Sequence, residues 1–335
     1  MEKTTKIYIA GHRGLAGGAV LRELQRLGYA NLLLRLHAEL DLEDAVRTQR
    51  FFAAERPEVV FLCAAKVGGI LANNTYPADF LLRNLLIEAN VIRAAFEVGV
   101  QRLIFLGSSC IYPRDCPQPI REEYLLTGPL EPTNRPYALA KIAGVELCWA
   151  YNRQHGTKFL AAMPTNLYGP GDSYDLTNSH VLPALIRKMH EAKEAGREEV
   201  VLWGSGTPRR EFLYADDLGR ALVFVAQLPS AHFDALVAPQ VCPLINLGTG
   251  EDLTIRELAE TIAEVVGYRG RFVYDSTKPD GTPRKVLDVS RLRGLGWAAA
   301  IALKDGIGRA YEDFRWRFDT APQSQISLTA QDRAD

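Results

Sequence analysis

The sequence predicts an α/β fold with a parallel sheet, followed by a smaller lobe. Short apolar segments such as residues 7–10, 59–64 and 103–106 alternate with helical segments, an order typical of βαβ units. A glycine-rich loop follows the first apolar segment and precedes a helix. After Tyr168-Gly169-Pro170-Gly171 turn residues become denser and helices and strands mix, which indicates a second lobe.

The elements of the first lobe are expected in a simple order. Apolar runs of four to six residues are taken as buried strands, and longer periodic runs as helices, one of them opened by Pro77. The expected order is strand 7–10, helix 17–27, strand 32–36, helix 41–55, strand 59–64, helix 78–98, strand 103–106, a Pro-rich loop 110–136, the helix that carries Tyr137, and a strand from Phe159 into Pro164-Thr165-Asn166.

The two lobes are expected to be interleaved along the chain. We expect a cofactor domain at 1–169, to which segments near 211–228 and 243–250 return, and a substrate domain at 170–318 with strands at 200–203 and 272–274. The tail at 319–335 is rich in Gln, Ser, Thr and Asp, so we expect it to be disordered.

Composition excludes several classes of protein. The 335 residues include 39 basic and 40 acidic side chains, with no basic block suited to nucleic acid or an anionic membrane. No apolar run approaches the roughly 20 residues that cross a bilayer, and no signal-peptide stretch precedes the first strand. Five cysteines without a Cys-x-x-Cys pair indicate reduced thiols, so we expect a cytoplasmic protein with no metal ion.

The glycine-rich loop predicts a dinucleotide site. Glycines spaced G-x-x-G-x-x-G let backbone N–H groups approach a pyrophosphate at a helix N-terminus. A tight turn is the alternative, but the position between a strand and a helix favours cofactor binding. The cofactor-binding residues expected here are Gly11, His12, Arg13, Gly14, Leu15, Ala16 and Gly17.

The end of the second strand favours NADP(H). An NAD site places an acid there to hold the ribose 2′-OH. Here the segment reads Leu34-Arg35-Leu36-His37, with no acid before Glu39, while Arg13 lies in the glycine loop. Cations at these positions suit a 2′-phosphate; the alternative is that Arg13 and Arg35 are solvated surface charges.

Tyr137 and Lys141 form the strongest catalytic signal. Residues four apart share one face of a helix. A lysine cation beside a phenol favours the phenolate, so we expect the pKa of Tyr137 to fall from about 10 toward neutrality, which suits acid–base work at a carbonyl oxygen. Ser108 follows a parallel strand, where α/β sheets bind ligands, and its hydroxyl can bond a substrate oxygen. A serine in a turn is the alternative for Ser108.

The glycine loop, the serine and Tyr-x-x-x-Lys together resemble the extended short-chain dehydrogenase/reductase family, which acts on nucleotide sugars. The resemblance covers about residues 6–318. It implies a Rossmann-type doubly wound parallel sheet of seven strands and a smaller C-terminal α/β substrate domain. It also implies a homodimer packed through the helices near 78–98 and 137–155.

The residues after Ser108 separate branches of that family. Dehydratases carry an Asp-Glu pair there, whereas this chain has Ser109-Cys110-Ile111-Tyr112. A thiol has a pKa of about 8.5, and a cation that lowers it lets the thiolate move a proton alpha to a ketone. A plain buried cysteine is the alternative for Cys110.

Longer runs resemble the GDP-sugar 3,5-epimerase/4-reductases of the same family. These are Ala65 to Ile70, Asn73 to Pro77, Gly107 to Pro113, Pro164 to Pro170, Asn178 to Val181, Trp203 to Pro208 and Lys278 to Lys285. The resemblance implies conversion of GDP-4-keto-6-deoxy-D-mannose to GDP-L-fucose. It implies that Cys110 as base and His180 as acid invert C3 and C5, and that Tyr137, Ser108 and Lys141 stabilise the enolate before NADPH reduces C4. A surface histidine opening a helix is the alternative for His180.

The resemblance also implies ligand contacts. The GDP part would be bound by Lys188, Trp203, Arg210 and Asp280. Two positions where the pattern has arginine carry His37 and Lys188 instead, which weakens the case for strict NADPH preference and softens GDP binding. Further cofactor contacts are implied at His37, Asp41, Leu42, Leu106, Gly107, Lys141, Pro164, Thr165, Asn166, Leu167 and His180.

Three other functions stay open from the sequence. A relative could epimerise or reduce a different keto-deoxy nucleotide sugar. A UDP-sugar 4-epimerase would keep tightly bound NAD. A non-catalytic NADP-binding regulator on the same fold usually lacks the tyrosine–lysine pair, which is present here.

Overall fold

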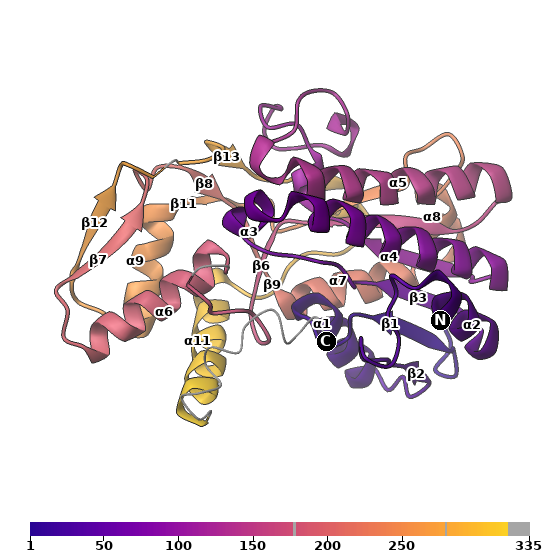
Figure 1. The fold of residues 1–335 in the computed structure, drawn as a ribbon, viewed down its shortest axis with the longest axis horizontal. Coiled ribbons are helices and arrows are strands. Elements are labelled where there is room, and N and C mark those ends of the chain that lie inside the picture. The colour runs from indigo at the N-terminus through magenta and orange to yellow at the C-terminus, as the bar shows by residue number, and fades with distance from the viewer. Residues whose placement is uncertain (177–178, 279, 321–335) are drawn as a thin grey trace.

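The computed structural model describes residues 1–176, 179–278 and 280–320. The expected tail beyond residue 320 lies outside these residues, as do Asn178 and Pro279 of the longer runs. Figure 1 shows two lobes, the larger with the main sheet on the right and the smaller on the left. No helix in the described part of the chain has the length and apolarity that a bilayer crossing requires.

The larger lobe contains a six-stranded sheet in which every pair of neighbours is parallel. Its residues alternate between two apolar clusters, one on each face, because side chains of a strand point to opposite sides. In order across the sheet the strands are β10 (Leu244–Leu247), β5 (Phe159–Pro164), β4 (Arg102–Leu106), β3 (Val59–Leu62), β1 (Ile7–Ala10) and β2 (Leu32–Leu33).

Helices cover both faces of this sheet, which confirms the doubly wound α/β class. On one face α4 packs against both α2 and α5, and on the other α1 packs against α7. Figure 1 shows α4 and α5 side by side in the upper part of the larger lobe, with α7 and α1 lower in the view. The bounds are α1 (Leu15–Arg26), α2 (Ala45–Glu55), α4 (Pro77–Val98), α5 (Arg135–His155), α7 (Ala215–Gln227) and α8 (Ser230–Leu236).

The edge of the sheet near β2 differs from expectation. The second strand covers Leu32–Leu33 alone, and the sheet has six described strands where the resemblance implies seven. The following segment forms turns, in which the N–H groups of Glu39 and Leu40 both bond the carbonyl of Leu36. These local bonds replace a strand ladder. The next helix begins at Ala45 rather than Asp41, because the Asp44 side chain accepts a bond from the Arg47 N–H and caps it.

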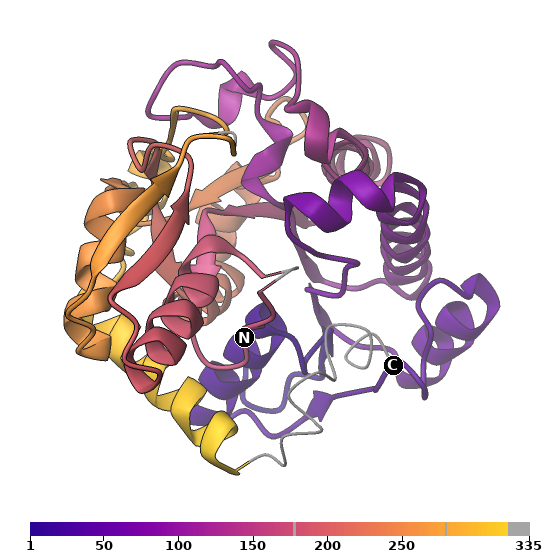
Figure 2. The same ribbon diagram turned by 60° about the vertical axis from the view of Figure 1, so that its left-hand side comes forward.

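The smaller lobe has its own apolar core, built around α6, α9 and α11. Figure 2 turns this lobe toward the viewer, with β7 and β12 paired along its outer side. Short ladders join β8 to β11 and β13, and β6 to β9. The bounds are β6 (Asn166–Tyr168), α6 (Val181–Glu194), β7 (Glu199–Trp203), β8 (Arg209–Arg210), β9 (Phe212–Tyr214), β11 (Leu253–Thr254), α9 (Ile255–Val266), β12 (Arg271–Asp275), β13 (Arg284–Lys285) and α11 (Leu303–Thr320).

Shorter helices connect these elements. They are α3 (Ile70–Thr75), α10 (Ser290–Gly294) and three 3-10 turns, η1 (Ser109–Ile111), η2 (Glu122–Tyr124) and η3 (Pro132–Asn134). The turn η1 directly follows β4, so it lies at the carboxyl edge of the sheet.

Candidate active site

The glycine-rich loop joins β1 to α1 in a form that side chains would block. Gly11 has φ +81°, and its carbonyl accepts a bond of 3.0 Å from the Gly14 N–H. A Cβ on Gly17 would lie 2.1 Å from that same carbonyl oxygen. Gly14 caps α1 without a side-chain bond, so the first N–H groups of the helix face the loop's outer side. The loop therefore offers backbone donors at a helix N-terminus.

These residues fit a dinucleotide. The Nδ1 atom of His12 is buried within the loop with no hydrogen-bond partner among the described residues. Burial lowers the pKa of His12, which keeps this ring neutral. Leu106, Gly107 and the segment Pro164 to Leu167 lie at the same carboxyl edge, at the ends of β4 and β5. A cofactor at this edge would reach from the glycine loop to these strand ends.

Arg13 of the glycine loop and His37 after β2 are the residues available to a 2′-phosphate. Arg35 is not among them, because it forms a 2.7 Å ion pair with Glu55 and lies over the ring of Phe51. Arg13 is exposed in the glycine loop. His37 Nδ1 lies 3.9 Å from Asp41 Oδ1, a pair that is ionic only when the ring is protonated.

Tyr137 and Lys141 lie on α5 with the expected helical spacing, but Tyr137 is not activated in the way we expected. Burial raises the pKa of the phenol well above its ordinary value, and the nearby Cys110 and Glu88 raise it further. The Lys141 ammonium is 3.0 Å from the buried Glu88 carboxylate and donates to the Leu106 carbonyl at 3.1 Å. The expected fall of the Tyr137 pKa toward neutrality is therefore wrong, because burial of the phenol raises this pKa and the Lys141 charge is paired with Glu88.

Ser108 and Cys110 follow β4. The Ser108 hydroxyl oxygen accepts a 3.4 Å bond from the Cys110 N–H and caps the turn η1. Cys110 is buried, and this burial raises the pKa of its thiol, while Lys285, the Ser108 bond and Lys141 oppose the rise. The expectation that a cation lowers the thiol pKa is therefore wrong in net direction, although the cations are present.

His180 comes from the smaller lobe, where it precedes the first residue of α6. The residue is open to solvent, yet the surrounding protein desolvates its ring and lowers the pKa of His180, with the positive charge of Lys285 adding to the effect. At neutral pH the resting forms are therefore a thiol at Cys110 and a neutral imidazole at His180. The thiol holds the proton, and the imidazole can accept one.

Lys285 is a site residue that the motif reasoning missed. It ends β13, and its charge acts on Cys110 of the larger lobe and on His180 of the smaller lobe. Burial lowers the pKa of Lys285, the charge of Arg210 lowers it further, and Cys110 opposes both effects. The signal was present in the run Lys278 to Lys285, but the run alone did not say which lysine faces the thiol. Pairing of β13 with β8 sets Lys285 opposite Arg210, and the effect of its charge on the Cys110 pKa identifies it as the lysine near the thiol.

The residues assigned to the GDP part gather on the smaller lobe. Trp203 ends β7 with 60% of its surface exposed, and the ammonium groups of Lys188 and Lys278 lie 5.4 and 5.5 Å from its ring centre. Burial lowers the pKa of Lys188. The Asp280 carboxylate accepts bonds from the backbone and hydroxyl of Ser205. An exposed aromatic ring flanked by cations suits a nucleotide base and its phosphates.

Arg210 and Glu211 connect this surface to the cofactor edge. Burial lowers the pKa of Arg210, and the charge of Asp280 opposes this. The backbone carbonyl of Glu211 accepts bonds from Thr165 and Asn166 of the cofactor edge. Its buried carboxylate accepts three backbone N–H bonds, from residues 249, 250 and 287. Motif reasoning assigned no role to Glu211, since an acid beside two arginines reads as surface charge.

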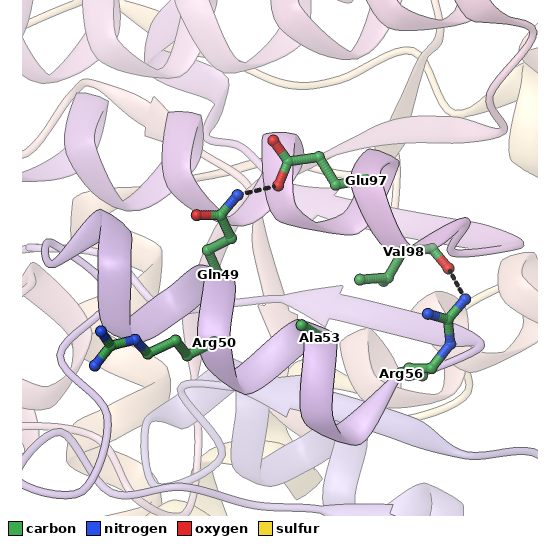
Figure 3. A pocket seen from close by; sticks show the side chains of 6 residues that line it. All are labelled: Gln49, Arg50, Ala53, Arg56, Glu97 and Val98. Carbon is green, nitrogen blue, oxygen red and sulfur yellow. Dashed lines mark hydrogen bonds between the residues drawn. The ribbon is translucent and has the colours of Figure 1, made fainter.

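A separate surface pocket lies away from these groups. It is formed between α2 and the end of α4 (Figure 3). There the Gln49 amide donates to the Glu97 carboxylate, and the Arg56 guanidinium donates to the Val98 carbonyl. These residues precede β3 and β4, so the pocket lies at the amino edge of the sheet, opposite the glycine loop. None of the predicted site residues lines it.

Comparison with known proteins identifies the family and similar enzymes. The model of the NAD dependent epimerase/dehydratase family matches residues 7–237. The chain is 54% identical over 309 residues to GDP-L-fucose synthase of Escherichia coli, covering 92% of this chain and 96% of the relative. It is 54% identical over 311 residues to GDP-L-fucose synthase 1 of Arabidopsis thaliana, covering 93% of each. A solved GDP-mannoheptose C4 reductase from Campylobacter jejuni, with NADP bound, has TM-score 0.85 and 39% identity over 94% of this chain and 99% of its own.

Proposed function

The chain belongs to the NAD dependent epimerase/dehydratase family, and on that premise we propose that it converts GDP-4-keto-6-deoxy-D-mannose to GDP-L-fucose. The reaction is a 3,5-epimerisation followed by NADPH-dependent reduction at C4. The observation that supports the proposal is that the charge of Lys285 acts both on Cys110, from the larger lobe, and on His180, from the smaller lobe, while Cys110 also lies close enough to Tyr137 to affect its pKa.

The cofactor is NADP(H), as in the solved relative that holds NADP. The glycine loop would hold its pyrophosphate, Arg13 and His37 its 2′-phosphate, and Lys141 with the Pro164 to Leu167 segment its nicotinamide end. When bound, the cofactor supplies a hydride to C4. All other steps fall to the side chains of this chain.

Epimerisation needs one group that removes a proton and one that returns it on the other face. The 4-keto group acidifies C3 and C5, and Cys110 and His180 exchange their protons. Because burial keeps Cys110 protonated and His180 neutral at rest, the thiol proton must first pass to the imidazole of His180, which leaves a thiolate base at Cys110 and an imidazolium acid at His180. Lys285 supplies the positive charge that favours loss of the thiol proton, and the hydroxyls of Tyr137 and Ser108 stabilise the enolate oxygen.

Reduction needs an acid at O4. Burial raises the pKa of Tyr137, so the phenol keeps the proton that it donates to O4 as the C4–H bond forms. The same environment that argues against a resting phenolate therefore suits the acid role.

The substrate part of the proposal places the GDP group on Lys188, Trp203, Arg210 and Asp280. We assign the larger lobe to residues 1–169 with the segments near 211–228 and 243–250, and the substrate lobe to 170–318. The 54% identity to two GDP-L-fucose synthases, against 39% to the mannoheptose reductase, favours this substrate over another keto-deoxy sugar. The tyrosine–lysine pair argues against a non-catalytic regulator.

We further propose a cytoplasmic homodimer packed through α4 and α5. Exposed leucines on these adjoining helices support it, namely Leu82, Leu86 and Leu139, since a helix pair with an apolar outer face favours burial against a copy of itself. All five cysteines are free, which suits a reducing compartment. Sedimentation equilibrium of the purified chain tests the dimer, and a monomer at micromolar concentration would refute it.

The test of function is the reaction in deuterated water with NADPH and GDP-4-keto-6-deoxy-D-mannose, analysed by NMR. GDP-L-fucose with deuterium at C3 and C5 is expected. NADPH oxidation without deuterium would leave a simple 4-ketoreductase and remove Cys110 and His180 from the mechanism. No reaction would indicate another nucleotide sugar or a regulator.

A further inference from the structure

A buried carboxylate on α4 faces the lysine of the Tyr137–Lys141 pair. Glu88 Oε1 lies 3.0 Å from Lys141 Nζ, and the two side chains expose 1% and 2% of their surface. The ammonium also donates to the Leu106 carbonyl and lies 4.8 Å from the ring centre of Phe105. Lys141 is therefore held from two sides, by a charge on α4 and by the end of β4.

The helix packing leaves room for this carboxylate. A Cβ at position 144 of α5 would lie 2.8 Å from Glu88 Oε2 and 2.4 Å from the Phe105 ring, so Gly144 is what lets α4 approach with an acid at this position. No group in the described residues donates a regular hydrogen bond to either carboxylate oxygen, so the ammonium is its charged partner. A buried ion pair gives little net stability over apolar side chains of the same size. Stability alone therefore does not explain an acid here.

The charge of Glu88 matters for Tyr137. A lysine alone beside a phenol favours the phenolate, whereas a carboxylate next to that lysine cancels its field. The titratable groups that face the phenol are Cys110 from η1, Glu88 from α4 and Lys141 from its own helix, and the ring of Phe80 contacts it edge-on. Those that face Glu88 are Lys141, Tyr137 and Cys148, all on α5. Burial raises the pKa of Glu88, and the charge of Lys141 and its bond to the carboxylate oppose this rise.

We propose that Glu88 is a positioning residue of the reduction step, which fixes the Lys141 ammonium and cancels its charge around Tyr137. The inference rests on the proposed function for its kinetic consequences. With the lysine charge cancelled, the phenol keeps its proton until O4 accepts it, and the resulting phenolate regains a proton from solvent before the next turnover. Without Glu88, the ammonium would favour the phenolate, which cannot protonate O4.

Glu88→Gln tests this directly. The amide has the shape of the carboxylate and still offers an oxygen to Lys141, but it carries no charge. We expect the alkaline limb of the pH profile of kcat for NADPH oxidation to move to lower pH by about one unit. Glu88→Asp retains the charge and is expected to shift the limb by less. A lower kcat with an unshifted limb in Glu88→Gln would leave a structural role only and overturn the proposal.

A substrate-free measurement separates this proposal from the proposed function. The tyrosinate absorbance of Glu88→Gln is followed as the pH is raised. The same titration of the double variant Glu88→Gln/Tyr137→Phe is subtracted, so that the difference reports Tyr137 alone. We expect the Tyr137 tyrosinate to form about one pH unit lower than in the matching comparison of the wild type with Tyr137→Phe. An unchanged titration would overturn the role of Glu88 even if the chain makes GDP-L-fucose. A titration shifted to lower pH would support that role even if the chain acts on another sugar. Where Glu88→Gln does not fold, the titration of Glu88→Asp decides, with a smaller shift in the same direction expected.

Discussion

Replacing Glu211 by Gln is expected to loosen the substrate lobe while sparing the cofactor site. In the wild type, the fully buried carboxylate accepts backbone N–H bonds from Thr249 and Gly250 at 2.6 and 2.8 Å on one oxygen, and from Leu287 at 2.7 Å on the other. An amide has one acceptor oxygen, so at least one of these N–H groups must face the amide NH2 group and lose its partner.

The expected loss follows from these contacts. A hydrogen bond to a charged group contributes about 1.5–3 kcal/mol, and a buried donor left without a partner costs about 1–3 kcal/mol. If the amide oxygen keeps the bonds from Thr249 and Gly250, only the bond from Leu287 is lost. Glu211→Gln should then lower the free energy of unfolding by about 3 kcal/mol. For a chain of 335 residues this is a decrease in Tm of roughly 4 °C.

The substitution should weaken binding of the GDP-sugar and leave binding of NADPH nearly unchanged. Leu287 lies two residues after Lys285, so losing its bond frees the strand end that carries this cation. Thr165 and Asn166 bond the backbone carbonyl of residue 211, which the substitution retains. KM for the GDP-sugar should therefore rise about tenfold, while the Kd of NADPH stays within twofold.

Differential scanning calorimetry, steady-state kinetics and NADPH titration together check this prediction. Glu251→Gln, a nearby exposed acid, is the matched control and should leave all three quantities unchanged. An unaltered Tm, or an equal weakening of both ligands, would refute the reasoning from the Glu211 carboxylate.

Four further substitutions test the candidate site. Tyr137→Phe should abolish reduction while NADPH binding survives in a fluorescence titration; full activity would remove the phenol from the mechanism. Cys110→Ser should slow solvent exchange at C3 and C5, followed by NMR, more than hydride transfer, and equal exchange would mean that the thiol is not the base. Lys285→Met should raise the pKa of Cys110 still further, since Lys285 opposes the effect of burial, so the exchange profile should move to higher pH by about one unit; a profile that stays in place argues against a thiolate stabilised by Lys285. His37→Arg should tighten NADPH relative to NADH by up to about tenfold, and an unchanged ratio of the two Kd values would place the discrimination on Arg13.

Much of the fold was predictable from local pattern. Fully apolar runs such as Val59–Leu62 have one stable environment, the centre of a parallel sheet, and α4 begins at Pro77, one residue before the expected start. The region after β2 was not predictable in this way. There the turn bonds to Leu36 and the Asp44 cap outcompete the extension of the strand and the helix, and such local competition has no clear periodic signal.

In the candidate site too, features set by local sequence were predictable and features set by distant residues were not. Spacing along one helix determines that Tyr137 and Lys141 share a face, and the glycine loop must follow a strand, so sequence was sufficient for both. Protonation was not predictable, because it depends on groups distant in sequence. Glu88 on α4 cancels the charge of Lys141, and burial exceeds the influence of Lys285 on Cys110.

The sequence by itself determined the class of fold, the cofactor loop and the residue types of the chemistry, because each depends on neighbours within a few positions of the chain. The tertiary structure alone decided which charges meet. Phe80, Asn84 and Glu88 follow a four-residue spacing on the buried face of α4, a pattern that marks Glu88 as an inward-facing acid but does not identify its partner. Its partner on α5 is 53 positions away, and only the packing of the two helices, with Gly144 between them, sets it 3.0 Å from the ammonium of Lys141.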